Sequence, residues 1–242
     1  MTWFRDDPHE NVIQMLFYYA TEFTLHIAMP YYMMTMRYAV NCGVINKRRH
    51  GRQLALGLRH IHAADVMHRD LKMNNILYSP KNNGTVVIAD LGSAIKMVRE
   101  PKIVRYETPV TTINYRAPEV ILCNGMYNDK IDVWSLGIVL LKIDNDTLEF
   151  NNTHTHEHNA LEIIYNQSMS IDGKLPDDGS WPGISNFSKW KRLLNTTVDN
   201  PHIINWHHAD AVFDDLLRHI LVMCPRHRYN IQEVLQHPYF AE

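Results

Sequence analysis

The stretch His68-Arg69-Asp70-Leu71-Lys72-Met73-Asn74-Asn75 is the most informative part of this chain, and Asp90-Leu91-Gly92 begins fifteen residues after it ends. The first stretch places an acid, a cation and an amide within one predicted loop. Short β-type runs surround both stretches, and Ala117-Pro118-Glu119 follows them. A single Asp in a polar loop is usually a turn or capping residue, but the joint spacing of three motifs argues against that interpretation here.

These residue types suit phosphoryl transfer. Such an enzyme positions the attacking hydroxyl and neutralises charge on the phosphates, so it needs a carboxylate near the hydroxyl and metal ligands near the phosphates. We predict that Asp70 orients and deprotonates the hydroxyl, and that Lys72 balances charge on the transferred group. Asn75 and Asp90 offer the hard oxygen ligands that Mg²⁺ prefers. Gly92 lets the backbone turn sharply after Asp90.

The composition is compatible with such an enzyme. The chain has 242 residues, of which 45% are hydrophobic, so it can bury a substantial core. A net charge of -2 gives no indication of a nucleic-acid partner. Three cysteines without CxxC spacing fit a reducing compartment. Residues 1–8 are too polar for a secretory signal and Trp134 to Leu141 is too short to span a bilayer, so we expect a cytoplasmic or nuclear protein without a membrane partner.

Residue periodicity predicts a chain with a few strands and many helices. Aromatic and β-branched residues predict two antiparallel strands, at about Val12 to Ala20 and Leu25 to Met29. A stripe of Leu54, Leu58 and Ile61 predicts a helix over residues 46–64. The other predicted elements are strands at Ile76 to Tyr78 and Val86 to Ala89, and helices at Val133 to Ile143, Ala160 to Tyr165, Ala211 to Met223 and Ile231 to Leu235. Alternating histidines at 154, 156 and 158 predict a solvated loop or, with less support, a metal site.

Four further motifs carry a family resemblance. The run Thr112-Ile113-Asn114-Tyr115-Arg116-Ala117-Pro118-Glu119 resembles the substrate-binding segment of cyclin-dependent and mitogen-activated kinases, and Asp132 to Gly137 resembles their central helix. Trp181-Pro182-Gly183 is similar to an insert of cyclin-dependent kinases, and His237-Pro238-Tyr239-Phe240 to the closing helix of the domain. Nearly the whole chain resembles the eukaryotic serine/threonine protein kinase family, most closely this group.

The resemblance implies an α+β fold with a truncated N-lobe sheet at residues 1–34 and a complete, mainly helical C-lobe at residues 35–242. It implies Asp70 as the catalytic base, Lys72 as a phosphate and substrate contact, and a hydrogen bond from Thr112 to the catalytic loop. Lys72, two residues after Asp70, is typical of kinases that phosphorylate serine and threonine, so these substrates are favoured over tyrosine. The implied substrates are proteins. The resemblance of residues 111–116 to the family's substrate-binding segment favours phosphorylation of Ser or Thr residues that are followed by proline.

The resemblance also implies a site for ATP and Mg²⁺. Asn75 and Asp90 would ligate the metal. Met29 would gate the back of the adenine pocket, and Leu77 would form its floor. Pro30, Tyr31 and Tyr32 would form the hinge. Proline has no N–H, but the family binds adenine through the N–H of the third hinge residue, which is Tyr32 here, so Pro30 removes no donor that the site needs.

Three other residues would support the site without performing chemistry. By resemblance, Glu119 and Arg228 form a buried ion pair that holds the activation segment. Asp132 holds the backbone of the catalytic loop from below.

The departures from the family pattern limit the expected activity. The 242 residues contain no Gly-rich phosphate loop, and we find no counterpart of the family's strand lysine and helix glutamate. Aligning residues 9–12 with the segment that enters the fourth strand puts Met1 just after that glutamate. We therefore expect an incomplete kinase domain that is poorly active alone. The alternatives are a kinase-like binding module or decoy, and a minimal active kinase.

Regulation is also expected to differ. Leu91 replaces the usual Phe, and Ile95 stands where many relatives place an arginine that contacts the activation-loop phosphate. With Ile95 there, Arg69 would have fewer partners for a phosphate. Glu107 could substitute for a phosphate, although a solvated loop charge is the favoured interpretation. A cyclin-like or kinase partner is compatible with the resemblance.

Overall fold

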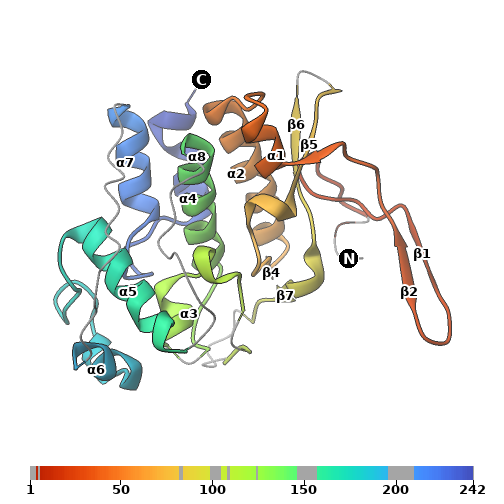
Figure 1. Ribbon diagram of the computed structural model, residues 1–242. Helices are drawn as coiled ribbons and strands as arrows, with labels where there is room; N and C mark the ends of the chain where they lie inside the picture. Colours follow the sequence, from red (N-terminus) through yellow and green to blue (C-terminus); the bar gives the residue numbers. More distant parts are fainter. Residues whose placement is uncertain are drawn as a thin grey trace.

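The computed structural model describes residues 4, 6–81, 84–98, 105–107, 110–123, 125–145, 157–195 and 210–241. The histidines at 154 and 156 lie outside these ranges. The described elements form a helical body and three small antiparallel sheets (Figure 1). None of the described helices is long and apolar enough to cross a membrane.

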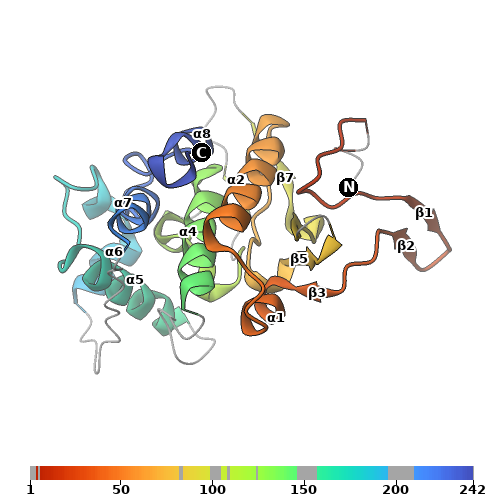
Figure 2. The same ribbon diagram turned by 90° about the horizontal axis from the view of Figure 1, so that it is seen from above.

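A hairpin of β1 (Phe17–Ala20) and β2 (Leu25–Ala28) projects from the helical body (Figures 1 and 2). In it Phe17 pairs with Ala28, and Ala20 pairs with Leu25. The predicted pair of strands is thus present, but the first is shorter than expected. Its first residues turn inward because Val12 and Ile13 are buried, and the Ile13 N–H donates to the Ile88 carbonyl at 2.8 Å.

The hairpin presents large apolar side chains on both of its faces. The four residues of β1 are all exposed, and Phe23 at the turn is 88% exposed. Between residues 11 and 34 the only acidic or basic side chain, histidine aside, is Glu22. Natural edge strands are usually protected by charges, so we expect this hairpin to be an association surface.

We expect the purified 242-residue chain to self-associate through this hairpin. Tyr18→Lys should lower the apparent mass in light scattering, because it places a charge on the exposed strand. Val212→Lys, an exposed apolar site on another element, should leave the mass unchanged. A monodisperse, cooperatively melting monomer of the unaltered chain would contradict this expectation.

Two further sheets lie between the hairpin and the helices. The larger joins β3 (Met34–Thr35), β5 (Ile76–Ser79) and β6 (Thr85–Ile88), and the smaller joins β4 (Val66–Met67) and β7 (Ile95–Lys96). Strands β5 and β6 confirm the two predicted short strands. Their hairpin places the two sequence motifs next to each other, because one motif precedes β5 and the other follows β6.

Helix α2 (Lys47–Ala63) confirms the predicted amphipathic helix and leads through β4 into the first motif. Asn46 caps it by accepting a hydrogen bond from the Arg49 N–H. Its stripe of Leu54, Leu58 and Ile61 is fully buried. Gly57 is required by packing, because a Cβ there would lie 2.6 Å from the Asn11 carbonyl oxygen.

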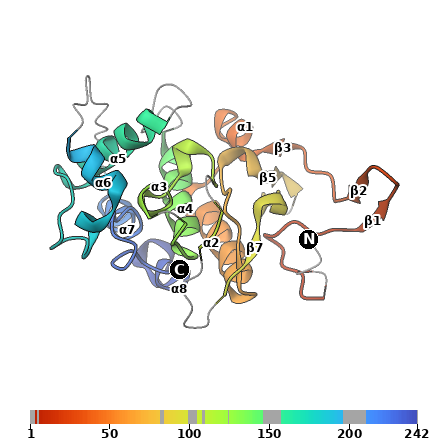
Figure 3. The same ribbon diagram turned by 90° about the horizontal axis from the view of Figure 1, so that it is seen from below.

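Helix α4 (Lys130–Asp144) runs through the centre of the body and is buried from Ile131 to Ile143, as predicted. Helices α2 and α7 (Ala211–Ile220) pack against it, and α3 (Pro118–Leu122) lies against α5 (Glu157–Asp172) and α6 (Ser188–Leu194) (Figure 3). Helix α1 (Met36–Asn41) packs on β3 and β5, and α8 (Ile231–Gln236) packs on α2.

Candidate active site

The first motif is held in place by a buried carboxylate at the start of α4. Asp132 is fully buried; one of its oxygens accepts hydrogen bonds from the His68 N–H (2.8 Å) and His62 Nε2 (2.9 Å), and the other from the Arg69 N–H (2.8 Å). Burial alone would raise the pKa of Asp132, but the hydrogen bond and charge of His62 hold it below its ordinary value.

These bonds stabilise an unfavourable backbone conformation. Arg69 has a φ of 66°, in the left-handed region that a non-glycine residue rarely adopts. Because Asp132 accepts hydrogen bonds from the successive N–H groups of His68 and Arg69, the turn is fixed before Asp70. Asp132 thus lies where the expected scaffold role requires it.

Asp70 lies at the centre of a hydrogen-bond network with three predicted site residues. Its Oδ1 accepts from the Thr112 N–H at 3.0 Å and the Thr112 hydroxyl at 2.8 Å. Its Oδ2 accepts from Lys72 Nζ at 2.7 Å and from Asn75 Nδ2 at 3.0 Å. Lys72 Nζ also donates to the Thr112 hydroxyl at 2.9 Å. The structure therefore brings these four side chains together across 42 residues of sequence.

The network also sets the charge of Asp70. Burial acts to raise its pKa, but the hydrogen bonds from Lys72 and Thr112 outweigh burial and hold the pKa below its ordinary value. Asp70 is therefore an ionised acceptor at neutral pH. Such a group can orient a hydroxyl and receive its proton as the oxygen attacks.

The backbone of Asn75 is bound to Ala89, the residue that precedes Asp90. The Ala89 N–H donates to the Asn75 carbonyl at 2.8 Å, and His68 Nε2 lies 2.9 Å from the Ala89 carbonyl. Asp90 has a φ of 61° and is exposed, and its Oδ1 accepts from the Gly92 N–H at 3.2 Å. Left-handed backbone at Asp90 turns the chain directly after β6.

The donor set of these two residues fits a magnesium ion. Asn75 Nδ2 is bound to the carbonyl and the side chain of Asp70, so its Oδ1 is oriented as the candidate ligand atom. A carboxylate and an amide oxygen are ligands that Mg²⁺ accepts while it keeps several waters.

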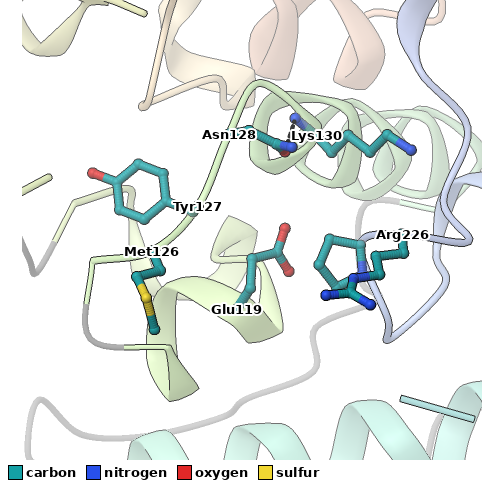
Figure 4. Close-up of a pocket in the computed structure, with 7 residues that line it drawn as sticks. Glu119, Met126, Tyr127, Asn128, Lys130 and Arg226 are labelled. Atoms are coloured by element: carbon teal, nitrogen blue, oxygen red, sulfur yellow. Dashed lines mark hydrogen bonds between the residues drawn. The ribbon is translucent and has the colours of Figure 1, made fainter. Parts of the chain in front are cut away.

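The predicted adenine-site residues show different degrees of burial. Leu77 on β5 and Tyr32 are half-buried and pack against the core. Met29 is 43% exposed, and Tyr31, in the predicted hinge, is 90% exposed. The cavity in Figure 4, with a volume of about 340 Å³, is lined by other residues, from α3, the start of α4 and the loop before α8.

The expected ion pair between Glu119 and Arg228 is present and buried. Arg228 Nη1 and Nη2 donate to the two Glu119 carboxylate oxygens at 2.6 and 2.9 Å, and both side chains are 1% exposed or less. The remaining Arg228 donors are bound to the carbonyls of Lys130 and Val222, and its guanidinium lies over the Trp134 ring. The pair ties α3, which follows the substrate-like segment, to the loop before α8.

The segment before α3 has one strained residue. Thr111 has a φ of 66°, and its carbonyl accepts from Arg116 Nη2 at 2.7 Å. Arg116 Nε donates to the Val110 carbonyl at 3.0 Å. The guanidinium therefore satisfies two successive carbonyls next to Thr112.

Sequence reasoning did not find two contributors to this site. His62 binds Asp132, and its only signal was a position next to Ile61 on the buried stripe of α2. Tyr127 donates to the Glu107 carbonyl at 2.9 Å and accepts from Arg69 Nη1 at 3.3 Å. No pattern in the sequence indicated that contact.

The loop fixed by the buried Asp132, and the Asp70 carboxylate shared by Lys72 and Thr112, form a site of the protein kinase type. The model of the protein kinase domain matches residues 2–240, and the chain belongs to the protein kinase family.

Its relatives lie among the mitogen-activated and cyclin-dependent kinases, as the sequence resemblance indicated. A mitogen-activated protein kinase, mpkC, of Aspergillus clavatus is 34% identical over 78% of this chain and 47% of its own length. A cell division control protein 2 homologue of Trypanosoma brucei brucei is 36% identical over 78% of this chain and 52% of its own. A probable cyclin-dependent serine/threonine-protein kinase of Dictyostelium discoideum is 30% identical over 78% and 28% respectively. The chain spans about half the length of these relatives or less.

Proposed function

We propose that this chain supplies the catalytic part of a serine/threonine protein kinase, which transfers the γ-phosphate of ATP to protein hydroxyls. The observation that carries the proposal is the network in which Asp70 is held by Lys72 and Thr112. Asp70 would orient the hydroxyl and accept its proton, and Lys72 would neutralise charge on the phosphoryl group. A bound Mg²⁺, held by Asn75 and Asp90, would neutralise the phosphates.

The proposed division of the chain is a partial N-lobe at residues 1–34 and a C-lobe at residues 35–242. The adenine would contact Met29, Leu77 and the hinge from Pro30 to Tyr32. The 242 residues contain no Gly-rich loop to cradle the phosphates. One preorganised charge contact of this kind contributes about a hundredfold or more in rate, so the chain alone should be poorly active.

The exposed hairpin favours a second candidate function, a kinase-like binding module that engages partners or substrates of other kinases. Relatives named as cyclin-dependent kinases make a cyclin-like partner a further proposal. An assay of the 242-residue chain separates the candidates: ATP–Mg²⁺ binding and slow peptide phosphorylation support the kinase, whereas peptide binding without nucleotide binding supports the module. Robust turnover that Asp70→Asn abolishes would contradict poor activity.

The segment around Thr111 supports proline-directed specificity. A bound peptide places the residue after its phosphoacceptor near this segment, by the family resemblance. Because Arg116 already occupies the Thr111 carbonyl, that carbonyl is a poor acceptor for a substrate N–H. An ordinary residue would leave its amide unsatisfied there, whereas proline has no N–H to satisfy.

We expect Arg116→Ala to reduce the preference for proline. The ratio of kcat/KM for a Ser-Pro peptide to that for a Ser-Ala peptide should fall by about threefold to tenfold, the equivalent of one hydrogen bond. The ratio is best measured on a completed chain, defined as this chain fused after the Gly-rich loop, strand lysine and helix glutamate of a mitogen-activated kinase. Arg192→Ala, on α6, is the control. A completed chain that shows no preference for proline would contradict the proposal.

A further inference from the structure

The catalytic-loop arginine is bound to a tyrosine hydroxyl. Arg69 is 8% exposed; its Nε donates to the Ser93 carbonyl at 2.6 Å, and its Nη1 donates to the Tyr127 hydroxyl at 3.3 Å. The Tyr127 hydroxyl in turn donates to the Glu107 carbonyl at 2.9 Å. The three groups form a continuous link from the residue before Asp70 to the segment that precedes Thr112.

Tyr127 is built into this position. It is 8% exposed, and burial raises its pKa, so the hydroxyl stays protonated and able to donate. In Figure 4 its hydroxyl points away from Glu119 and Lys130, which lie on the other side of the same cavity. The Tyr127 hydroxyl therefore contacts the segment at residues 105–107 and not the buried Glu119–Arg228 ion pair.

A second set of contacts holds the same segment. The Tyr106 N–H donates to the Gly125 carbonyl at 3.0 Å, and the Tyr106 and Tyr127 rings lie 5.2 Å apart. Gly125 has a φ of 87°, and a Cβ there would lie 2.4 Å from the Tyr106 carbonyl oxygen, so only glycine permits this approach. The Tyr106 hydroxyl accepts from the Val98 N–H at 3.2 Å.

By the family resemblance, Arg69 is the residue that would contact an activation-loop phosphate, and its Nη1 here donates to the Tyr127 hydroxyl. Ile95 packs against the core and offers no charge to a phosphate. Glu107 joins the link through its backbone carbonyl, so its carboxylate is not required as a phosphate substitute in this arrangement.

We propose that Tyr127 is a positioning residue that fixes the activation segment on Arg69 and thereby makes its ordered conformation independent of phosphorylation. The inference rests on the proposed kinase function, because it assigns Tyr127 a part in positioning the catalytic loop. The experiment that tests it does not require kinase activity. The role of Tyr127 is to transmit the position of residues 105–107 to the loop that carries Asp70.

The test is hydrogen exchange of the Tyr106 amide in the purified 242-residue chain, without nucleotide or substrate. Phosphatase treatment should leave this exchange unchanged. Tyr127→Phe should accelerate it by about threefold to tenfold, because one hydrogen-bonded link is lost, while core amides of α2 stay protected. Tyr229→Phe, in which a tyrosine that stacks on His219 loses its hydroxyl, is the matched control and should have no effect.

Two results would overturn the proposal. One is faster Tyr106 exchange after phosphatase treatment of the unaltered chain, and the other is unchanged exchange in Tyr127→Phe. If Tyr127→Phe does not fold, Arg69→Lys breaks the same link from its other end and should give the same acceleration. Since none of these measurements needs phosphoryl transfer, a failure of the proposed function would appear separately, as a folded completed chain that does not phosphorylate peptides.

In an active completed chain the effect should fall on kcat. Tyr127→Phe should lower kcat by about threefold to tenfold and leave KM for ATP unchanged, because Tyr127 acts through the position of Asp70. If kcat/KM fell by the same factor because KM rose while kcat stayed unchanged, Tyr127 would not be a positioning residue.

Discussion

Asp70→Asn in the completed chain is expected to lower kcat for peptide phosphorylation by at least about a hundredfold, the range of a lost general base. The amide keeps the size of the carboxylate but loses its charge and its ability to accept a proton. The substitution affects hydrogen bonds that the Asp70 side chain makes to Thr112 and Lys72, which are contacts within the protein. Because contacts to the substrate are not removed, KM should change much less than kcat. The measurement is steady-state transfer of labelled phosphate to a Ser-Pro peptide.

The matched control is Asp6→Asn, which removes an exposed carboxylate away from the network. It should leave kcat unchanged. If Asp70→Asn retained more than a tenth of the activity, Asp70 could not be the catalytic base.

The second large effect concerns stability. Arg228→Ala should lower the free energy of unfolding by about 3–5 kcal/mol, because it leaves the Glu119 carboxylate buried without its partner. Three bonds from Arg228 to backbone carbonyls are lost as well. The measurement is urea unfolding followed by circular dichroism.

Arg218→Ala provides the comparison, since Arg218 pairs with Asp214 at the surface of α7. That exposed pair should contribute at most about 0.5 kcal/mol. Equal effects of the two substitutions would show that the Glu119–Arg228 pair does not hold the segment. Glu119→Gln, which removes the charge but keeps the shape, should cost less than Arg228→Ala.

The sequence predicted the elements whose pattern is regular. Helices α2 and α4 follow from a clean apolar stripe and a continuous apolar run, and β5 and β6 follow from β-branched runs around a turn. The short helices α1, α3 and α6 were not predicted, whereas the equally short α8 was. The strand predicted from Val12 was too long at its start because tertiary contact with β6 outweighed local propensity.

The candidate site was predictable where it depends on motif spacing. Asp70, Lys72 and Asn75 lie together as the motif spacing indicated, and Thr112 joins them as the family resemblance implied. The roles assigned to these residues stay predictions. The left-handed conformation of Arg69 could not be predicted, because it depends on hydrogen bonds to Asp132, 63 residues away. That of Thr111 is accompanied by a bond from Arg116, five residues away, which no motif indicated. The link through Tyr127 joins residues 58 positions apart and leaves no local pattern.

The most direct measurement is the rate of phosphate transfer from ATP to a Ser-Pro peptide by the completed chain and by the 242-residue chain under the same conditions. We predict clear transfer by the completed chain, at least about a hundredfold faster than by the 242 residues alone. A folded completed chain that binds ATP and Mg²⁺ but transfers no phosphate would contradict the proposed kinase function. Equal rates for the two chains would contradict the proposal that the 242 residues, which contain no Gly-rich loop, are poorly active alone.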